Sequence, residues 1–250
     1  MPATTTPTAD VRFPVAGGRE MRAALALPPG HRPGDRHPGV LVVHEIWGLN
    51  DDIRSIAARF ASLGYAALAP DLYDRPGPRL LCIARTFATL RRGSGDAFDD
   101  LDAARRWLAA RPEVDGSRIG AIGFCMGGGF ALLFAVRAPL GATANFYGEV
   151  PDDAAALRGT CPVLGSFGGQ DRVFGRKAAV LDRHLSELGI DHDVKVYPDA
   201  GHSFMSRNEG LLAKLGAFGP MRVAYDPAAA EDSWRRIEAF FGRHLGAAGA

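Results

Sequence analysis

The sequence has few cysteines, no excess of charge of either sign and no long apolar run, and each absence excludes a class of protein. Three cysteines in 250 residues argue against a disulfide framework and for a reducing compartment. The 29 basic and 28 acidic residues nearly balance, so the charge predicts neither a nucleic-acid nor an anionic-membrane partner. No uncharged apolar stretch reaches the roughly 18 residues of a membrane span, and no signal-type N-terminus is present. We therefore expect a cytoplasmic protein.

The chain divides into a short leader and one large unit. Residues 1–10 are rich in Thr, Ala and Pro without periodicity, and we expect a flexible leader. Residues 11–250 have the length of a single α/β domain. Val11–Val15 and Met21–Leu27 flank a glycine turn and predict a hairpin at a sheet edge. The proline-rich residues 28–38 predict an exposed connector.

From Val40 onward, short apolar runs alternate with stripes of helical spacing. Strands are predicted at 40–43, 65–69, 119–124, 144–147, 163–167 and 194–197, and helices around 53–63, 98–108, 181–188 and 234–241, with another beginning near Phe130. Repeated strand–helix alternation predicts an α/β fold, with a mostly parallel sheet and helices on both faces.

Two long segments, 72–95 and 203–227, show neither the apolar runs of buried strands nor the spacing of an amphipathic helix. Each follows a predicted strand, and ligands in open α/β sheets bind beyond the carboxyl ends of the strands. Long irregular loops in such positions are either lids over a site or tolerated surface insertions. The sequence leaves both interpretations open.

The strongest chemical signal is the pentapeptide Gly123-Phe124-Cys125-Met126-Gly127, which joins an apolar strand to an apolar helix. It matches the nucleophile elbow G-x-C-x-G, whose tight turn needs small residues two positions before and after the nucleophile. The turn would direct the Met126 amide toward an oxyanion. A buried, inert cysteine is the alternative when the pentapeptide is taken alone.

The order of two further residues favours catalysis. In α/β-hydrolases the acid and the histidine follow the nucleophile, each after a later strand. Asp171 follows the strand 163–167, and His202 follows the strand 194–197. Together with Cys125 they predict a Cys-His-Asp triad.

The segment from His44 to Asn50 follows a buried strand beside the predicted elbow. Glu45 falls at the carboxyl edge of the sheet, and the Ile46 amide is the candidate for the second oxyanion donor. The zinc motif H-E-x-x-H would need histidine at position 48, which is Gly48. No ligand-spaced partner is evident for His31, His37, His184, His192 or His244, so we predict no metal site and no cofactor.

With these pieces assembled, the chain resembles the dienelactone hydrolase (carboxymethylenebutenolidase) family of the α/β-hydrolases. The resemblance rests on H-E-I-W-G-L-N at 44–50, A-P-D-L-Y at 69–73, G-F-C-M-G-G at 123–128, G-G-Q-D at 168–171 and A-G-H-S-F at 200–204. It implies Cys125 as nucleophile, His202 as base and Asp171 as the group that orients the imidazole. It also implies that Glu45 lies beside the resting thiol.

The resemblance further implies two arginines that bind a substrate carboxylate. Arg85 and Arg207 are the candidates, although the segment carrying Arg85 aligns poorly with the family pattern. Trp47, Tyr147 and Phe204 are candidates for an apolar pocket around the acyl group.

The predicted reaction is hydrolysis of a small lactone or ester through a thioester on Cys125. A general carboxylesterase or thioesterase is the nearest alternative, and a non-catalytic redox-sensing thiol on the same fold is the second. The oligomeric state is left open.

Overall fold

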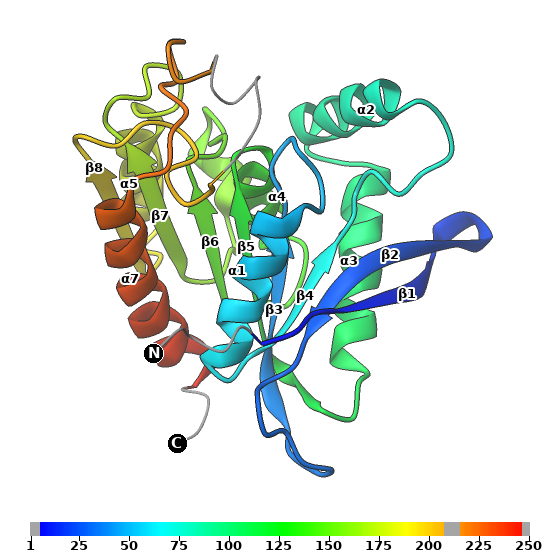
Figure 1. Ribbon diagram of the computed structural model, residues 1–250. Helices are drawn as coiled ribbons and strands as arrows, with labels where there is room; N and C mark the ends of the chain where they lie inside the picture. Colours follow the sequence, from blue (N-terminus) through cyan, green and yellow to red (C-terminus); the bar gives the residue numbers. More distant parts are fainter. Residues whose placement is uncertain (1–5, 208–215, 247–250) are drawn as a thin grey trace.

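One eight-stranded sheet runs through the computed structural model, which describes residues 6–207 and 216–246. The strand order is β1-β2-β4-β3-β5-β6-β7-β8 (Figure 1). The strands are β1 (Ala9–Val15), β2 (Arg19–Ala26), β3 (His37–Val43), β4 (Ala66–Pro70), β5 (Val114–Phe124), β6 (Ala142–Phe146), β7 (Val163–Gly168) and β8 (His192–Tyr197). β2 is antiparallel to both β1 and β4, and the neighbours from β4 to β8 are parallel. The predicted α/β class and the edge hairpin are confirmed.

Helices cover both faces of the sheet, as predicted (Figure 1). They are α1 (Asp51–Ser62), α2 (Arg79–Arg92), α3 (Asp96–Ala109), α4 (Met126–Phe134), α5 (Lys177–Glu187) and α7 (Pro227–Leu245). The apolar faces of α1 and α7 pack together on one side, and those of α3 and α4 share a second core on the other. In the described part of the chain, no helix combines the length and apolar character that a bilayer crossing requires.

The helix that follows β3 begins where the sequence provides a cap. The Asn50 side chain accepts a hydrogen bond from the Ile53 amide at 3.1 Å, and Asp51 and Asp52 lie in the first turn. A cap and acidic groups there satisfy free amides and interact favourably with the helix dipole. Ile53 and Phe60 point into the core and are almost fully buried. The α1 N-terminus is thereby held directly after the 44–50 loop.

The expectation for residues 72–95 was wrong, because this segment contains the helix α2. Its buried face includes Thr86 and Thr89 beside Cys82 and Leu90, so the apolar period that identifies a helix in sequence is interrupted. Leu80 and Leu81 are exposed, which obscures the pattern further. The helix lies beyond the carboxyl end of β4 and packs against α3 and α4 (Figure 1).

Two further expectations need correction at the N-terminal side of the fold. The leader ends earlier than residue 10, because β1 begins at Ala9 and pairs with Leu25 of β2; residues 1–5 lie outside the described part. His31 and His37 were expected to have no ligand-spaced partner, yet His31 Nδ1 and His37 Nε2 lie 3.1 Å apart. A turn in the connector brings the two rings together, which spacing along the chain did not reveal.

Candidate active site

Cys125 lies at the sharp turn between β5 and α4, in the strained conformation that the elbow motif predicts. Its φ of 55° and ψ of −118° are unusual for a residue with a side chain, and its amide donates to the Phe146 carbonyl at 3.0 Å. A Cβ atom at Gly123 would lie 1.9 Å from the Gly127 oxygen, and one at Gly127 would lie 2.3 Å from the Val43 oxygen. Both glycines are therefore required by backbone proximity, as expected.

The carboxylate of Asp171 and the imidazole of His202 form a short buried hydrogen bond. Asp171 Oδ2 lies 2.6 Å from His202 Nδ1, and each residue is 2% exposed. The other oxygen, Oδ1, accepts the amides of Val173 at 2.9 Å and Phe174 at 3.0 Å. The carboxylate is thus held in one orientation, and it requires a proton on Nδ1 of the imidazole.

The environment of the His202 ring favours the imidazolium form. Burial alone would lower its pKa, but the neighbouring Cys125 sulfur and the Asp171 carboxylate raise the pKa of His202 to about 10. The rings of Tyr147 and Phe174 pack against the imidazole, with centroids 5.0 and 5.2 Å away. With Nδ1 bound to Asp171, Nε2 is the nitrogen available to exchange a proton with Cys125.

The backbone around His202 is held by a segment that the sequence could only describe as irregular. The His202 amide donates to the Met221 carbonyl at 2.8 Å, and its own carbonyl accepts from Ala224 at 3.1 Å. A Cβ atom at Gly201 would lie 1.7 Å from the Arg222 oxygen, so glycine is needed for this close approach. Within 203–227, residues 208–215 lie outside the described part, while the 216–226 portion supports the histidine.

The backbone amides of Met126 and Ile46 are the two predicted oxyanion donors. Met126 is the first residue of α4, and the first amides of a helix have no intrahelical acceptor. Among residues 6–207 and 216–246, neither Met126 N–H nor Ile46 N–H makes a backbone hydrogen bond outside the helices and strands. His44 shapes the loop that carries Ile46, because Nδ1 lies 2.7 Å from the Glu45 carbonyl and Nε2 accepts the Leu72 amide at 3.1 Å.

Glu45 is buried next to the Tyr147 hydroxyl. Glu45 is only 2% exposed. Tyr147 is fully buried, and its backbone φ is 43°. Burial and the charge of Glu45 raise the pKa of Tyr147 well above its usual value, so the hydroxyl keeps its proton. Cys125 also interacts electrostatically with Tyr147. Glu45, Tyr147 and Cys125 therefore form one electrostatically connected group.

The predicted pocket residues take different positions. Trp47 is half-buried on the 44–50 loop. Phe204 is fully buried in the core, where its ring packs 5.1 Å from both Tyr147 and Tyr197. Its position supports Tyr147 from behind and offers no exposed surface to a substrate.

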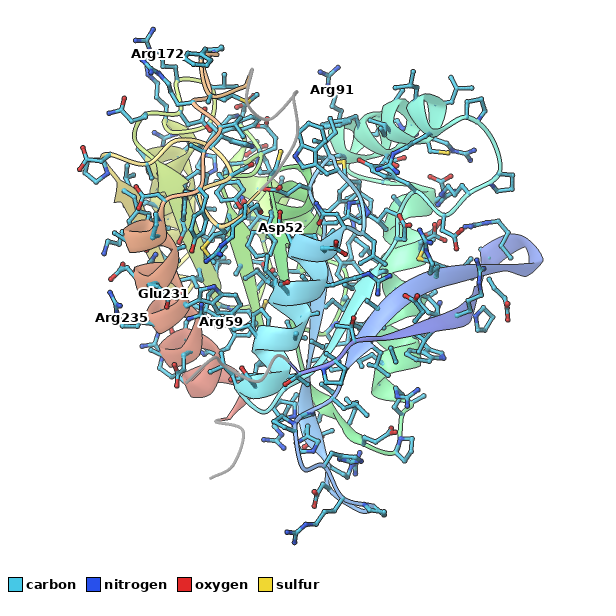
Figure 2. All side chains as sticks on the ribbon, in the orientation of Figure 1. Asp52, Arg59, Arg91, Arg172, Glu231 and Arg235 are labelled. Atoms are coloured by element: carbon cyan, nitrogen blue, oxygen red, sulfur yellow. The ribbon has the colours of Figure 1, made fainter. Side chains whose placement is uncertain are left out.

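The two predicted arginines bind other parts of the protein. Arg85 of α2 pairs with Asp96 of α3 at 2.6 Å. Arg207 stacks on the Tyr225 ring at 4.8 Å, and its amide donates to Asp52 at 3.2 Å. The Arg207 side chain borders a groove of about 620 Å³ between α1 and α7. Arg59 and Glu231 face each other in this groove (Figure 2). None of the candidate triad residues lines this groove.

A third arginine, Arg79, lies against the 44–50 loop and was not among the sequence candidates. It lies in the first turn of α2, donates to the Trp47 carbonyl at 2.5 Å, and has its guanidinium 5.9 Å from the centre of the Tyr73 ring. The Tyr73 hydroxyl in turn lies 3.4 Å from the Met126 sulfur. Because α2 was not predicted, nothing in the sequence distinguished Arg79 from the other arginines of the segment.

Comparisons with known proteins identify the family to which the chain is similar. The dienelactone hydrolase family profile matches residues 21–245. A candidate carboxymethylenebutenolidase of Methylorubrum extorquens is 32% identical, covering 96% of this chain and 84% of the relative. The solved structure of a candidate dienelactone hydrolase from Klebsiella pneumoniae is similar at a TM-score of 0.77 and 27% identity, covering 95% of this chain and 98% of that one.

A second solved structure, that of a protein named for a different activity, is also similar to this chain. It is a dienelactone hydrolase-like promiscuous phosphotriesterase from metagenomic libraries, with a TM-score of 0.78 and 29% identity. The similarity covers 96% of this chain and 99% of that one.

Proposed function

The chain belongs to the dienelactone hydrolase family, and we propose that it hydrolyses a small lactone or ester through a thioester on Cys125. The observation that carries the proposal is the short Asp171–His202 hydrogen bond, at 2.6 Å, beside the elbow cysteine. A carboxylate that orients a histidine next to a nucleophile is the arrangement that acyl transfer requires.

In the first half-reaction, His202 takes the Cys125 proton and the thiolate attacks the acyl carbon. The carbonyl oxygen becomes an oxyanion that accepts hydrogen bonds from the Ile46 and Met126 amides. As the tetrahedral intermediate collapses, the C–O bond of the ester breaks and the leaving oxygen takes the proton from His202. A lactone opens in this step, and an open-chain ester releases its alcohol.

In the second half-reaction, water attacks the thioester carbon while His202 Nε2 accepts one of its protons. The same two amides stabilise the second oxyanion. When the C–S bond breaks, Cys125 leaves as a thiolate and the carboxylic acid product is released. The Asp171 carboxylate, 2.6 Å from Nδ1, stabilises the imidazolium that forms in this step.

Glu45 and Tyr147 fit a protective role between turnovers. The family resemblance implies that Glu45 lies beside the resting thiol of Cys125, and a thiol is less easily oxidised than a thiolate. The protonated Tyr147 hydroxyl offers a donor to Glu45 whether or not the substrate is present. We therefore assign Glu45 to the resting state and His202 to the active one.

The chemistry around Trp47 and Arg79 supports a substrate that carries a carboxylate. Arg79 is a cation whose guanidinium donates to the Trp47 carbonyl in the 44–50 loop, which also carries the predicted oxyanion donor Ile46. Carboxylates bind arginine through strong charge-assisted hydrogen bonds. Arg79 thus replaces Arg85 and Arg207 as the first candidate for this contact.

The test compares a carboxylated enol lactone with a neutral aryl acetate, using wild type and Cys125→Ala. We expect faster opening of the lactone by wild type and no turnover by Cys125→Ala, with a mass increase equal to the acyl group on Cys125 in quenched wild-type reactions. Hydrolysis of neutral esters alone would support the carboxylesterase alternative. Reversible peroxide oxidation of Cys125 without any ester hydrolysis would overturn the proposal in favour of a redox sensor.

A further inference from the structure

A second cluster of ligand-type side chains lies at the opposite end of the sheet from Cys125. It is in the connector between β2 and β3, at the bottom of Figure 1. His31, Asp35 and His37 each offer one ligand atom, and these three atoms lie within 4.8 Å of one another. Within residues 6–207 and 216–246 they form the one such group of three His, Cys, Asp or Glu side chains.

The connector holds these side chains by backbone hydrogen bonds. The Asp35 amide donates to the Arg32 carbonyl at 3.1 Å, and the Arg32 amide donates to Asp35 Oδ2 at 2.8 Å. Gly34 adopts a φ of 98°, which permits the chain to reverse its direction between Arg32 and Asp35. The reversal places His31 opposite His37, whose amide is tied to the Glu113 carbonyl at 2.9 Å. Ordered ligands lose less conformational entropy on binding an ion.

From this cluster we propose that the connector binds a divalent transition-metal ion of the Zn²⁺ type. Two imidazole nitrogens bound to a tetrahedral ion at roughly 2.0–2.1 Å lie about 3.3 Å apart. The observed separation of 3.1 Å between His31 Nδ1 and His37 Nε2 is close to this distance. Asp35 supplies a carboxylate as third ligand, and water completes the tetrahedron.

The donor set selects the class of ion. Imidazole suits Zn²⁺, Ni²⁺, Cu²⁺ and Co²⁺, whereas Ca²⁺ and Mg²⁺ prefer oxygen ligands throughout. Two neutral imidazoles and one carboxylate leave a net positive charge on a bound ion, and Glu113 lies close enough to His31 to interact with it electrostatically. Arg118 opposes the ion through its interaction with His37. The two effects offset each other in part.

A hydrogen bond within the connector orients the third ligand. The Arg32 amide on Asp35 Oδ2 fixes the carboxylate in the way that outer hydrogen bonds orient metal ligands.

A bound ion would join the connector to the body of the fold. His37 begins β3, and the Arg36 guanidinium donates to the Val114 carbonyl at the start of β5 at 3.2 Å. The ion would therefore cross-link the 28–36 connector to the paired ends of β3 and β5. Its expected effect is on stability, since the cluster lies at the far end of β3 from Glu45.

The experiment titrates chelator-treated full-length protein with ZnCl₂ by calorimetry, and separately with CoCl₂ while the visible spectrum is recorded. We expect one high-affinity equivalent, a tetrahedral Co²⁺ absorption, and a higher thermal unfolding midpoint with Zn²⁺. Loss of a residue that only orients a metal ligand costs roughly 10–100-fold in metal affinity. His31→Gln removes a direct ligand, so it should weaken the Zn²⁺ affinity by at least this factor. Asp35→Asn should weaken it by about 10-fold.

Two controls separate this cluster from other sites. His192→Gln removes another histidine that pairs with a carboxylate, at 3.4 Å from Asp182, and should leave Zn²⁺ binding unchanged. Cys125→Ala should also bind normally, which excludes the thiol as the ligand. Binding that survives His31→Gln at full affinity, or that disappears in Cys125→Ala, would overturn the proposal. Absence of any Zn²⁺ or Co²⁺ binding by wild type would overturn it as well.

Discussion

Replacing Asp171 by Asn tests the candidate triad most directly, because the structure determines how the new amide must orient. The backbone amides of Val173 and Phe174 both donate to Oδ1, so the oxygen of the Asn side chain must occupy that position. Its NH₂ group then faces His202 Nδ1, where Oδ2 is now. The imidazole must accept at Nδ1 and carry its proton on Nε2, which is the wrong tautomer for a base toward Cys125.

The expected loss in kcat is about 10³–10⁴-fold, which corresponds to ~4–5.5 kcal/mol of transition-state stabilisation. The size follows from the tautomer and from the lost charge, since the imidazolium no longer has a carboxylate 2.6 Å away. The pKa of His202, about 10 in the wild type, should fall, and this fall is measurable by following the imidazole resonances with pH. Steady-state hydrolysis of an aryl acetate gives kcat.

Asp199→Asn is the matched control, because Asp199 is an exposed carboxylate three residues before His202. It should retain wild-type kinetics, and both variants should unfold cooperatively. A stable Asp171→Asn protein with kcat within tenfold of wild type would refute the assigned role of Asp171. An equal loss in both variants would show a general charge effect instead.

Four further predictions follow from other contacts. Arg79→Gln should raise KM for a carboxylated lactone about 10–100-fold without changing KM for a neutral ester, whereas Arg85→Gln should change neither; equal KM values in all three proteins would remove Arg79 from the site. Gly127→Ala should lower the thermal unfolding midpoint by several degrees or prevent folding, because its Cβ would lie 2.3 Å from the Val43 oxygen, and a wild-type midpoint would contradict the elbow geometry. Tyr147→Phe keeps the ring but removes the hydroxyl beside Glu45, so urea denaturation should show a loss of about 1–3 kcal/mol, and an unchanged midpoint would exclude the contact. The raised pKa of His202 contributes stability that is complete below its unfolded value of about 6.5 and is lost as pH rises toward 10, so the free energy of unfolding should decline over that range, and His202→Gln should flatten the decline.

The local pattern was sufficient for the elements that lie in the core. The alternation of apolar runs and helical stripes predicted the order of strands and helices from β3 to α7, because strands and helices differ in the period of their buried residues. The same pattern did not predict the helix α2. Its buried face carries Thr86 and Thr89, and its first turn exposes Leu80, so burial and hydropathy no longer coincide there.

The roles of the arginines depended on tertiary contacts in the same way. Arg79, Arg85 and Arg207 have identical side chains on segments that follow predicted strands, and sequence ordering offered no reason to prefer Arg79. The structure separates them by partners: the Trp47 carbonyl for Arg79, Asp96 for Arg85, and Asp52 with Tyr225 for Arg207. These partners come from elements distant in the chain, and no local rule encodes such distances.

The order of Cys125, Asp171 and His202 was present in the sequence by itself, because each follows a strand whose neighbours in a parallel sheet bring the strand ends together. The requirement for glycine at 123 and 127 was present as well, since the turn chemistry is local. Only the tertiary structure decided what surrounds these residues: the 216–226 segment that holds His202, the Tyr147 hydroxyl beside Glu45, and the turn that brings His31 to His37. The physical reason is that short-range periodicity specifies which face of an element is buried, whereas the partners across a buried interface depend on how distant segments pack.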